Sequence, residues 1–253
     1  MRLPEYLSAA ISQFRSGDGS SAVAAASREL TRRYKSASFA TPAVNSSADR
    51  SAYLAARFPA TFAANFRVLS ELRRLAPEVE ISSLLDLGAG PGTSSFAAAE
   101  IFSGLASATL VEADPQWIQL GKQLANHSPH TTVRNAQCLQ RDLHDPAGLP
   151  VHDAVVISYA LGELASAALE QVLGRAWRSA KNFLVIIEPG TKRGFAAVNA
   201  ARTFLIQQGA GLLAPCPHRK ACPMAAAGDW CHFSQRLERT AEHRHIKGAS
   251  LGY

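Results

Sequence analysis

The stretch SLLDLGAGPGTSSFAAAEIF, residues 83–102, decides the fold that this sequence predicts. A short apolar run, SLLDL, leads into the glycine-rich turn GAGPG at residues 88–92, and an alanine-rich run with helical character follows. Glycines let the chain turn sharply and let a ligand approach the backbone without a Cβ in the way. Strand, glycine turn and helix in this order predict a loop that binds a cofactor at the start of a helix.

Acidic residues around this turn indicate the class of cofactor. Asp86 precedes Gly88, Gly90 and Gly92 in an Asp-x-Gly-x-Gly-x-Gly pattern. The dinucleotide fingerprint instead spaces its glycines Gly-x-Gly-x-x-Gly. Glu112 ends the next predicted strand, where a carboxylate can accept hydrogen bonds from both hydroxyls of a ribose. We therefore predict S-adenosylmethionine as the cofactor, with its amino group facing Asp86, and a nicotinamide dinucleotide as the alternative.

The region from 81 to about 208 alternates short apolar runs with longer amphipathic segments. This pattern predicts an α/β domain with a parallel, Rossmann-like sheet of the class I methyltransferase type. The predicted strands cover residues 83–87, 108–112, 132–136, 154–158 and 183–188. The last of them is apolar throughout, as expected of a strand covered on both faces. No convincing pair of strands follows it, so we expect the sheet to lack its last strands.

Two further loops should lie near the cofactor. Asp142 follows the third predicted strand, where it would accept a hydrogen bond from the adenine amino group, and Ser158 ends the fourth. In the loop from Ser158 to Leu164, Tyr159 and Glu163 are the polar candidates for catalysis. The loop lacks the Asn/Asp-Pro-Pro-aromatic turn of adenine amino methylation and the cysteine nucleophile of pyrimidine carbon-5 methylation. The sequence thus predicts a cofactor pocket without a recognisable base or nucleophile.

Residues 1–80 predict a helical N-terminal extension. Apolar residues recur at spacings of three and four, which would place them on one face of a helix. They are Phe58, Phe62, Phe66, Leu69 and Leu72. The stretches 16–21 and 42–49 are expected as linkers between helices, because they are rich in glycine, serine and other polar residues.

Residues 209–253 predict a cysteine-rich segment that binds a metal. Cys216, Cys222 and Cys231 follow a Cys-x5-Cys-x8-Cys spacing, and the segment has too little hydrophobic periodicity to form a core alone. Zinc and an iron–sulfur cluster both accept such thiolates. His218 or His232 could complete a zinc site, whereas a four-iron cluster prefers a fourth thiolate.

Composition limits the class of protein. The chain has 253 residues, of which 47% are hydrophobic, enough for one main domain. No apolar run reaches the length of about 18 residues that a membrane span needs, and the start lacks a secretory signal, so we expect a soluble, intracellular protein.

A net charge of +6 favours a polyanionic partner, with the basic run 236–247 as a phosphate-contact surface or a solvated helix face. Cys138 stands apart as an expected small core residue.

Several segments together carry a resemblance to a known family. They are the stretch 53–61, the glycine loop, the loop 158–164, the stretch 187–191, the cysteine segment with its GDWCHF motif, and the endings HIKG and LGY. Over roughly residues 50–253 the sequence resembles the mitochondrial and bacterial small-ribosomal-subunit methyltransferase-like proteins. The cysteine segment is the most specific part of the resemblance.

The resemblance implies a class I methyltransferase fold, association with the small ribosomal subunit or its rRNA rather than DNA, and a [4Fe-4S] cluster on Cys216, Cys222 and Cys231. The family's fourth cluster cysteine and last strands lie beyond Tyr253, so it also implies an incomplete domain. A bacterial cytoplasmic location is favoured over a mitochondrial matrix. Two functions stay open: methyl transfer to rRNA, and a non-catalytic assembly factor that binds S-adenosylmethionine and the cluster.

Overall fold

The structure is a computed structural model, and it describes residues 1–15, 20–36, 44 and 46–238. Within them, the helices before the sheet are α1 (Glu5–Arg15), α2 (Ser20–Ser36), α3 (Ser47–Ala56) and α4 (Phe58–Leu75). The region that follows contains β1 (Ser83–Leu87), α5 (Thr93–Ile101), β2 (Ser107–Glu112), α6 (Pro115–Ala125), α7 (Thr131–Arg134), β3 (Gln137–Gln140), β4 (His152–Ser158), η1 (Leu161–Glu163), α8 (Ser166–Ser179), β5 (Ala180–Ile187), α9 (Lys192–Gln207) and α10 (Pro223–Ala226).

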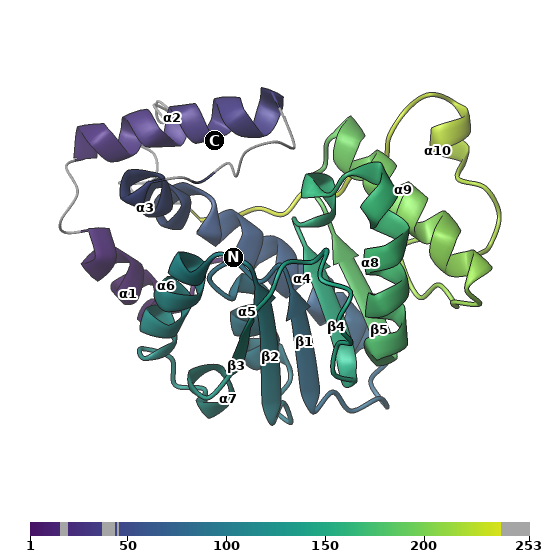
Figure 1. The fold of residues 1–253 in the computed structure, drawn as a ribbon, viewed down its shortest axis with the longest axis horizontal. Coiled ribbons are helices and arrows are strands. Elements are labelled where there is room, and N and C mark those ends of the chain that lie inside the picture. The colour runs from purple at the N-terminus through teal and green to yellow at the C-terminus, as the bar shows by residue number, and fades with distance from the viewer. Residues whose placement is uncertain (16–19, 37–43, 45, 239–253) are drawn as a thin grey trace.

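The described strands form one parallel sheet in the order β3-β2-β1-β4-β5 (Figure 1). The chain begins in the middle at β1, moves outward to β3 and then returns to the other side of β1 with β4. This reversal brings the carboxyl ends of β1 and β4 side by side, which is where open parallel sheets bind their ligands. The predicted Rossmann-like fold is confirmed.

Two hydrophobic layers cover the sheet. On one face, Leu84 and Val156 share a core with residues of α1, α4 and α5, including Phe62 and Phe96. On the other face, Leu85 and Ile157 pack with residues of α8 and α9. Neighbouring residues of one strand point to opposite faces, so β1 must be apolar almost throughout.

The N-terminal extension is helical, as predicted. The expected apolar face falls within α4, where Phe58, Phe62 and Leu69 are completely buried. Of the two expected linkers, residues 16–19, 42–43 and 45 lie outside the described residues. Ser20 and Ser21 begin α2, and residues 47–49 begin α3, where the Ser46 hydroxyl accepts a hydrogen bond from the Asp49 amide.

The third strand was predicted in the wrong place. Residues 131–134 form the short helix α7, and β3 follows at Gln137–Gln140, paired in parallel with β2. Val133 is buried as a helical residue, and the Thr132 hydroxyl donates to the Leu105 carbonyl at 2.6 Å. This tertiary contact holds the turn beside the start of β2, and local sequence does not encode it.

The prediction that the fifth strand is covered on both faces holds in part. Val185 and Ile187 are buried in one core, whereas Leu184 and Ile186 pack against the other core and are only partly buried. In the described sheet β5 pairs only with β4. β5 spans Ala180–Ile187 rather than the predicted residues 183–188. Glu188 therefore lies in the loop that leads to α9.

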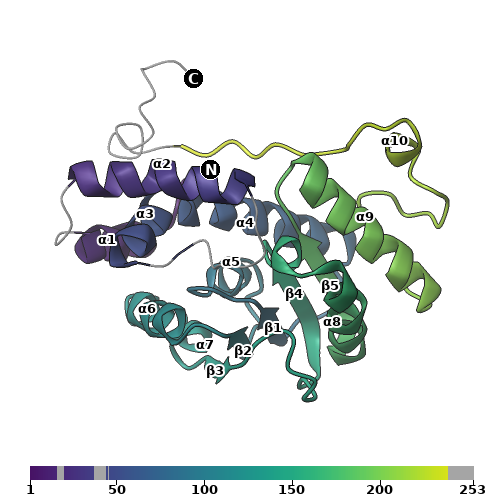
Figure 2. The same cartoon turned by 45° about the horizontal axis from the view of Figure 1, so that its top comes forward.

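The described C-terminal segment, residues 208–238, contains little regular structure apart from α10. Figure 2 shows it leaving α9, passing through α10 and running back toward α2. The Trp230 indole donates to the Gly190 carbonyl at 3.3 Å, and the Glu238 amide donates to the Met1 carbonyl at 2.8 Å. The segment is therefore attached at two points to elements far away in sequence.

Candidate functional site

The glycine loop after β1 has the geometry that its sequence predicts. Gly88, Gly90 and Gly92 have φ angles of +68°, +55° and +83°, a region that residues with a Cβ rarely adopt. The Gly88 amide donates to the Val111 carbonyl at 2.9 Å, which ties the loop to the end of β2. A Cβ on Gly88 would come within 2.7 Å of the Ala160 Cβ, so this glycine also allows the loop after β4 to approach.

Asp86 lies at the end of β1 and is almost completely buried. Its Oδ2 accepts from the Ser95 amide at 3.2 Å and from the Ser95 hydroxyl at 3.0 Å, both in the first turn of α5. Its Oδ1 has no hydrogen-bond partner within the described part of the chain. Burial, with a smaller contribution from the charge of Glu112, raises the pKa of Asp86 to about 7.

Glu112 connects the end of β2 to the glycine loop. Its Oε2 accepts from the Gly90 amide at 2.8 Å, and its Oε1 accepts from the Asp114 amide at 2.9 Å. Each carboxylate oxygen can accept more than one hydrogen bond, so both can still bind ribose hydroxyls. Burial also raises the pKa of this half-buried carboxyl.

The loop after β4 starts with a strained residue. Tyr159 has a φ angle of 60°, which is uncommon for a residue with a bulky side chain. Its amide donates to the Ile187 carbonyl at 2.7 Å, the last residue of β5. Burial raises the pKa of the Tyr159 phenol to about 12, so this side chain stays neutral near pH 7 and is a poor general base.

Two carboxyls flank this loop. Glu188 accepts from the Leu161 amide at 2.8 Å and from the Gly162 amide at 3.4 Å, and loss of hydration raises its pKa to about 7. Glu163 lies at the exposed rim, where partial desolvation and the charge of Glu112 raise its pKa. Glu188 therefore holds the loop in place, while Glu163 faces outward beside it.

Asp86, Glu112, Glu163 and Glu188 form an acidic group along the carboxyl ends of the strands. The charge of Glu112 raises the pKa of both Asp86 and Glu163, and the charge of Glu163 raises that of Glu188. Coupled, poorly hydrated carboxyls of this kind mark ligand sites. A ligand with positive charge relieves their repulsion, whereas the pyrophosphate of a dinucleotide would add to it.

Sequence reasoning missed the contribution of α4. Asn65 is completely buried and donates to the Ser158 hydroxyl at 2.9 Å, so α4 reaches the end of β4. Burial raises the pKa values of Tyr53 and Tyr159, and the positive charge of nearby Arg57 opposes that rise at both phenols. The stretch 53–61 and Glu188 belonged to the segments that carried the family resemblance, which was the available signal.

Asp142 lies after β3, as expected, but it is exposed and its hydrogen bonds are local. Its Oδ1 accepts from the His144 amide at 2.8 Å and contacts His144 Nδ1 at 2.6 Å. It borders a small hollow together with Leu87 and Val111, residues of β1 and β2. Its predicted role at the adenine ring stays a prediction.

The cysteines of the C-terminal segment are not brought together. Cys216 and Cys231 are exposed and Cys222 is half-buried. Among residues that the structure describes, no group of three or more His, Cys, Asp or Glu is placed to hold a metal ion. Cys138 lies half-buried on β3, which agrees in part with the expected small core residue.

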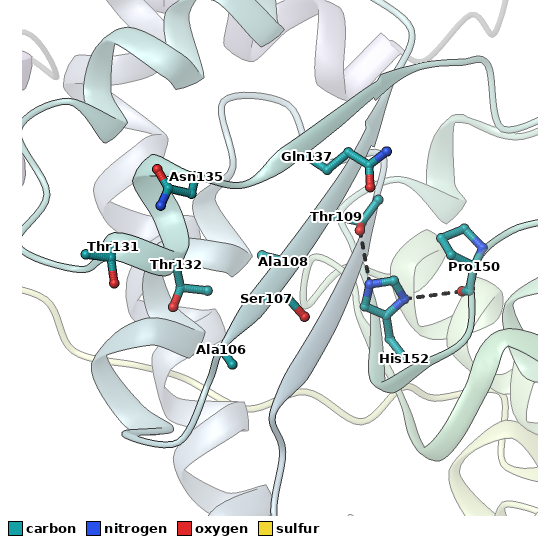
Figure 3. Close-up of a pocket in the computed structure, with 10 residues that line it drawn as sticks. All are labelled: Ala106, Ser107, Ala108, Thr109, Thr131, Thr132, Asn135, Gln137, Pro150 and His152. Carbon is teal, nitrogen blue, oxygen red and sulfur yellow. Dashed lines mark hydrogen bonds between the residues drawn. The ribbon is translucent and has the colours of Figure 1, made fainter.

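A hollow of about 360 Å³ lies at the opposite edge of the sheet, near the amino ends of β2 and β4 (Figure 3). Its polar lining includes His152, which contacts the Thr109 hydroxyl at 3.0 Å and the Pro150 carbonyl at 3.3 Å. These contacts use both ring nitrogens within the protein. We place the candidate site at the glycine loop, because parallel sheets bind ligands at their carboxyl ends.

Comparison with known proteins gives the family. Residues 47–253 match the family described as "Mitochondrial small ribosomal subunit Rsm22". The chain belongs to the Rsm22 family. It is 29% identical over 206 residues to Rsm22-cox11 tandem protein 2, mitochondrial, of Schizosaccharomyces pombe, a match covering 74% of this chain and 27% of that protein. It is 29% identical over 195 residues to the human ribosome assembly protein METTL17, mitochondrial, covering 72% of this chain and 42% of that protein.

The chain thus spans less than half the length of these relatives. Among solved structures it is similar to the glycopeptide N-methyltransferase MtfA, with 21% identity, a TM-score of 0.41 and coverage of 48% of this chain and 52% of that one. It is also similar to a precorrin-6y C5,15-methyltransferase from Geobacter metallireducens GS-15, with 20% identity, a TM-score of 0.41 and coverage of 56% and 70%.

The family membership confirms the resemblance that the sequence motifs carried, and the sheet has the parallel, Rossmann-like strand order that the sequence predicted. No helix in the described part of the chain combines the length and hydrophobicity that crossing a bilayer requires. The names of the curated relatives place them in mitochondria, so the comparisons do not support the preference for a cytoplasmic location.

Proposed function

We propose that this Rsm22-family chain binds S-adenosylmethionine at the glycine loop and acts on the small ribosomal subunit. The observation that carries the cofactor assignment is the acidic group around a loop whose backbone is open at Gly90. A Cβ on Gly90 would meet no atom within 4 Å, so the loop has free space there. S-adenosylmethionine carries sulfonium and ammonium charges that suit Asp86 and Glu112, and it would supply an electrophilic methyl group.

The chain's own residues would hold the cofactor in three places. Gly88 and Gly90 allow close approach to the backbone, the Glu112 carboxylate accepts from the ribose hydroxyls, and Ser158 borders the methionine end. Asp142 is the candidate for the adenine amino group. Tyr159 and Glu163 would position the acceptor rather than ionise it, because the phenol of Tyr159 stays neutral.

The first candidate function is methyl transfer to the rRNA of the small subunit. Incubation with isotopically labelled S-adenosylmethionine and immature small subunits should label RNA. Gly90→Arg fills the open space at the loop and should abolish the labelling. Gly104→Arg is the matched control, because Gly104 is exposed, lies outside the site and has open space around its Cβ position. Equal labelling with both variants would show that the pocket is elsewhere.

The second candidate is an assembly factor that binds the cofactor without turnover. The loop after β4 favours it, since Tyr159 and Glu163 provide no strong base or nucleophile there. The human relative METTL17 is named as a ribosome assembly protein, which also agrees with this function. This function predicts that Gly90→Arg still cosediments with small subunits and that Cys222→Ser does not. Equal cosedimentation of Cys222→Ser and wild type would count against it.

The proposal also includes a metal bound by the cysteine segment. The family resemblance implies a [4Fe-4S] cluster on Cys216, Cys222 and Cys231, with zinc as the alternative. Anaerobic purification with absorbance spectra and metal analysis tests this directly. Brown protein with bound iron supports the cluster, whereas stoichiometric zinc rejects it. The mitochondrial names of the relatives favour the matrix as the location.

A further inference from the structure

Three ring-bearing side chains lie within four consecutive residues of the C-terminal segment, at Trp230, His232 and Phe233. The rings of Trp230 and His232 stack, with their centroids 6.0 Å apart and their planes 25° from parallel. His232 is exposed, and Phe233 is 76% exposed, more than any other large hydrophobic side chain in the described part of the chain. Single exposed hydrophobic residues are common, but a group of exposed rings indicates a surface that a partner covers.

The fold holds this aromatic group at the end of β5. The Trp230 indole donates to the Gly190 carbonyl at 3.3 Å, and a Cβ on Gly190 would lie 3.0 Å from the Cβ of His232. Gly190 belongs to the loop between β5 and α9. Trp230 is therefore fixed by the edge of its ring, whereas His232 and Phe233 are open to solvent.

The aromatic group lies close to the loop after β4. The segment passes the first turn of α9, where Lys192 Nζ lies 5.0 Å from the centroid of the Trp230 ring (Figure 2). The next residue, Arg193, donates to the Gly162 carbonyl in the loop after β4. Glu188 also connects the two loops, since it accepts from the Gly162 amide at 3.4 Å. The rings therefore stand beside the loop that would face a methyl acceptor.

The surroundings of the aromatic group are basic. Residues 189–238 contain six lysines and arginines but only two acidic residues. Both acidic side chains are engaged, because Asp229 accepts from the Trp230 amide at 2.8 Å and Glu238 pairs with Arg2 at 2.6 Å. The six basic residues are exposed or half-buried, and they are Lys192, Arg193, Arg202, Arg219, Lys220 and Arg236. Such a surface attracts a polyanion.

The combination of rings and positive charge distinguishes between polyanions. In a duplex the bases stack on one another, so a protein contacts mainly the backbone and has little use for exposed rings. Unpaired bases have free faces and stack on aromatic and imidazole side chains, while basic residues follow the phosphates. The exposed rings of His232 and Phe233 therefore favour a single strand over a helix.

We propose that His232 and Phe233, together with Lys192, form an aromatic platform that binds unpaired bases of single-stranded RNA beside the loop after β4. The bases stack on the two exposed rings, and the Lys192 ammonium contacts a phosphate. The inference rests on the proposed action on the small ribosomal subunit, and it specifies that the RNA contacted is unpaired. It applies equally to an enzyme and to an assembly factor, because no bond is made or broken on the platform.

The test measures binding of fluorescent RNA to the whole chain, purified anaerobically. The probes are an oligouridine about 12 nucleotides long, which is within the length that one such surface covers, and its duplex with oligoadenosine. Wild type should bind the single strand more tightly. Phe233→Leu keeps an apolar side chain but removes the ring, so it should weaken single-strand binding by about 5-fold or more and leave duplex binding unchanged. Phe233→Trp should retain the preference.

Two further variants separate the ring from hydrophobicity and charge. Val151→Ala is the matched control, because Val151 is 64% exposed and lies just before β4, at the opposite edge of the sheet. It should bind both RNAs as wild type does. Lys192→Gln should weaken both RNAs and reduce the dependence of binding on salt, because it removes a phosphate contact.

Calorimetry with S-adenosylhomocysteine on the same samples separates the platform from the cofactor pocket. If wild type binds RNA but not the nucleoside, the cofactor assignment fails and the platform stands. If it binds the nucleoside but not RNA, the platform is wrong and the pocket stands. Equal binding of single strand and duplex would mean that charge alone makes the contact. If Phe233→Leu binds the single strand as wild type does, the rings serve another kind of partner, and either result overturns the inference.

Discussion

Two regions of the molecule were predicted from the spacing of reactive residues: the glycine-loop region, residues 83–114, and the cysteine segment, residues 209–238. The predicted residues come together in the first region but not in the second. In the loop region the predicted residues meet: Glu112 accepts from the Gly90 amide at 2.8 Å and Asp86 from the Ser95 amide at 3.2 Å. In the cysteine segment, Cys216 and Cys231 remain exposed and apart from any described metal-binding group.

The difference comes from where the binding partners are. The carboxylates of the loop region bond to backbone amides of the same chain, and Leu84, Leu85 and Leu87 bury completely beneath them. Cysteine ligands need a metal to bring them to one point, because metal binding supplies the free energy that orders such a site. Phe233 shows how little core the segment has, since it is 76% exposed. Spacing predicts a site fully only where the chain contains all its partners.

The largest effect should come from closing the loop region. Gly88→Val places a β-branched side chain at a φ of +68°, with its Cβ position 2.7 Å from the Ala160 Cβ. Strain and overpacking together should lower the free energy of unfolding by about 4 kcal/mol and abolish cofactor binding. Urea unfolding and calorimetry measure both. Gly104→Val, at a position with open space, should do neither; a stable Gly88→Val that binds normally would refute the loop geometry.

The next effect is a pH dependence confined to the loop region. Burial raises the pKa of Asp86 to about 7 from its ordinary 3.8, so its folded state prefers the protonated form. The stabilising contribution is fully present below pH 3.8 and is lost as the pH rises through about 7. Between pH 5 and 8 the loss should be on the order of 2 kcal/mol.

Asp86→Asn removes this titration while it keeps the shape of the side chain. The fall in stability from pH 5 to 8, followed by urea unfolding, should become shallower in the variant. It should not vanish, because the pKa of Glu188 is also raised to about 7. An identical slope in variant and wild type would mean that Asp86 is ionised and solvated in the folded protein.

A smaller effect should appear where the cysteine segment is attached. The Trp230 indole donates to the Gly190 carbonyl at 3.3 Å, its ring stacks on His232, and Lys192 Nζ lies 5.0 Å from its centroid. Trp230→Ala should cost about 1 kcal/mol, locally. Hydrogen exchange should accelerate in residues 209–238 and stay unchanged in α5. Phe233→Ala serves as the exposed aromatic control, and equal exchange in both variants would argue against the attachment.

Much of the fold was predictable because buried elements have a characteristic pattern of apolar residues in the local sequence. The first strand was predicted to the residue, since a parallel strand covered on both faces is a continuous apolar run. The third strand was misplaced, because residues 131–134 form a short helix held by a contact between Thr132 and Leu105 that is distant in sequence and leaves no local pattern. Asn65 was missed for a similar reason. In the sequence it is one polar residue in an amphipathic helix, and only the fold shows its contact with Ser158.

The smallest effect should come from the cysteines themselves in metal-free protein. Cys216 is exposed, so Cys216→Ser should change the free energy of unfolding by less than about 0.5 kcal/mol. Cys138→Ser is the control, because this half-buried thiol packs on β3 and its pKa is raised by burial, so a hydroxyl there should cost more.

The same Cys216→Ser variant separates the two explanations of the exposed thiols. If a metal organises the segment, protein loaded anaerobically with iron or zinc should melt at a higher temperature than metal-free protein, and the variant should lose both the bound metal and the increase. A variant that retains wild-type metal content and melting temperature would show that Cys216 is not a ligand. The cysteine spacing would then not indicate a metal site. The two regions would differ because only the glycine loop is a binding site, and not because the cysteine segment lacks its metal.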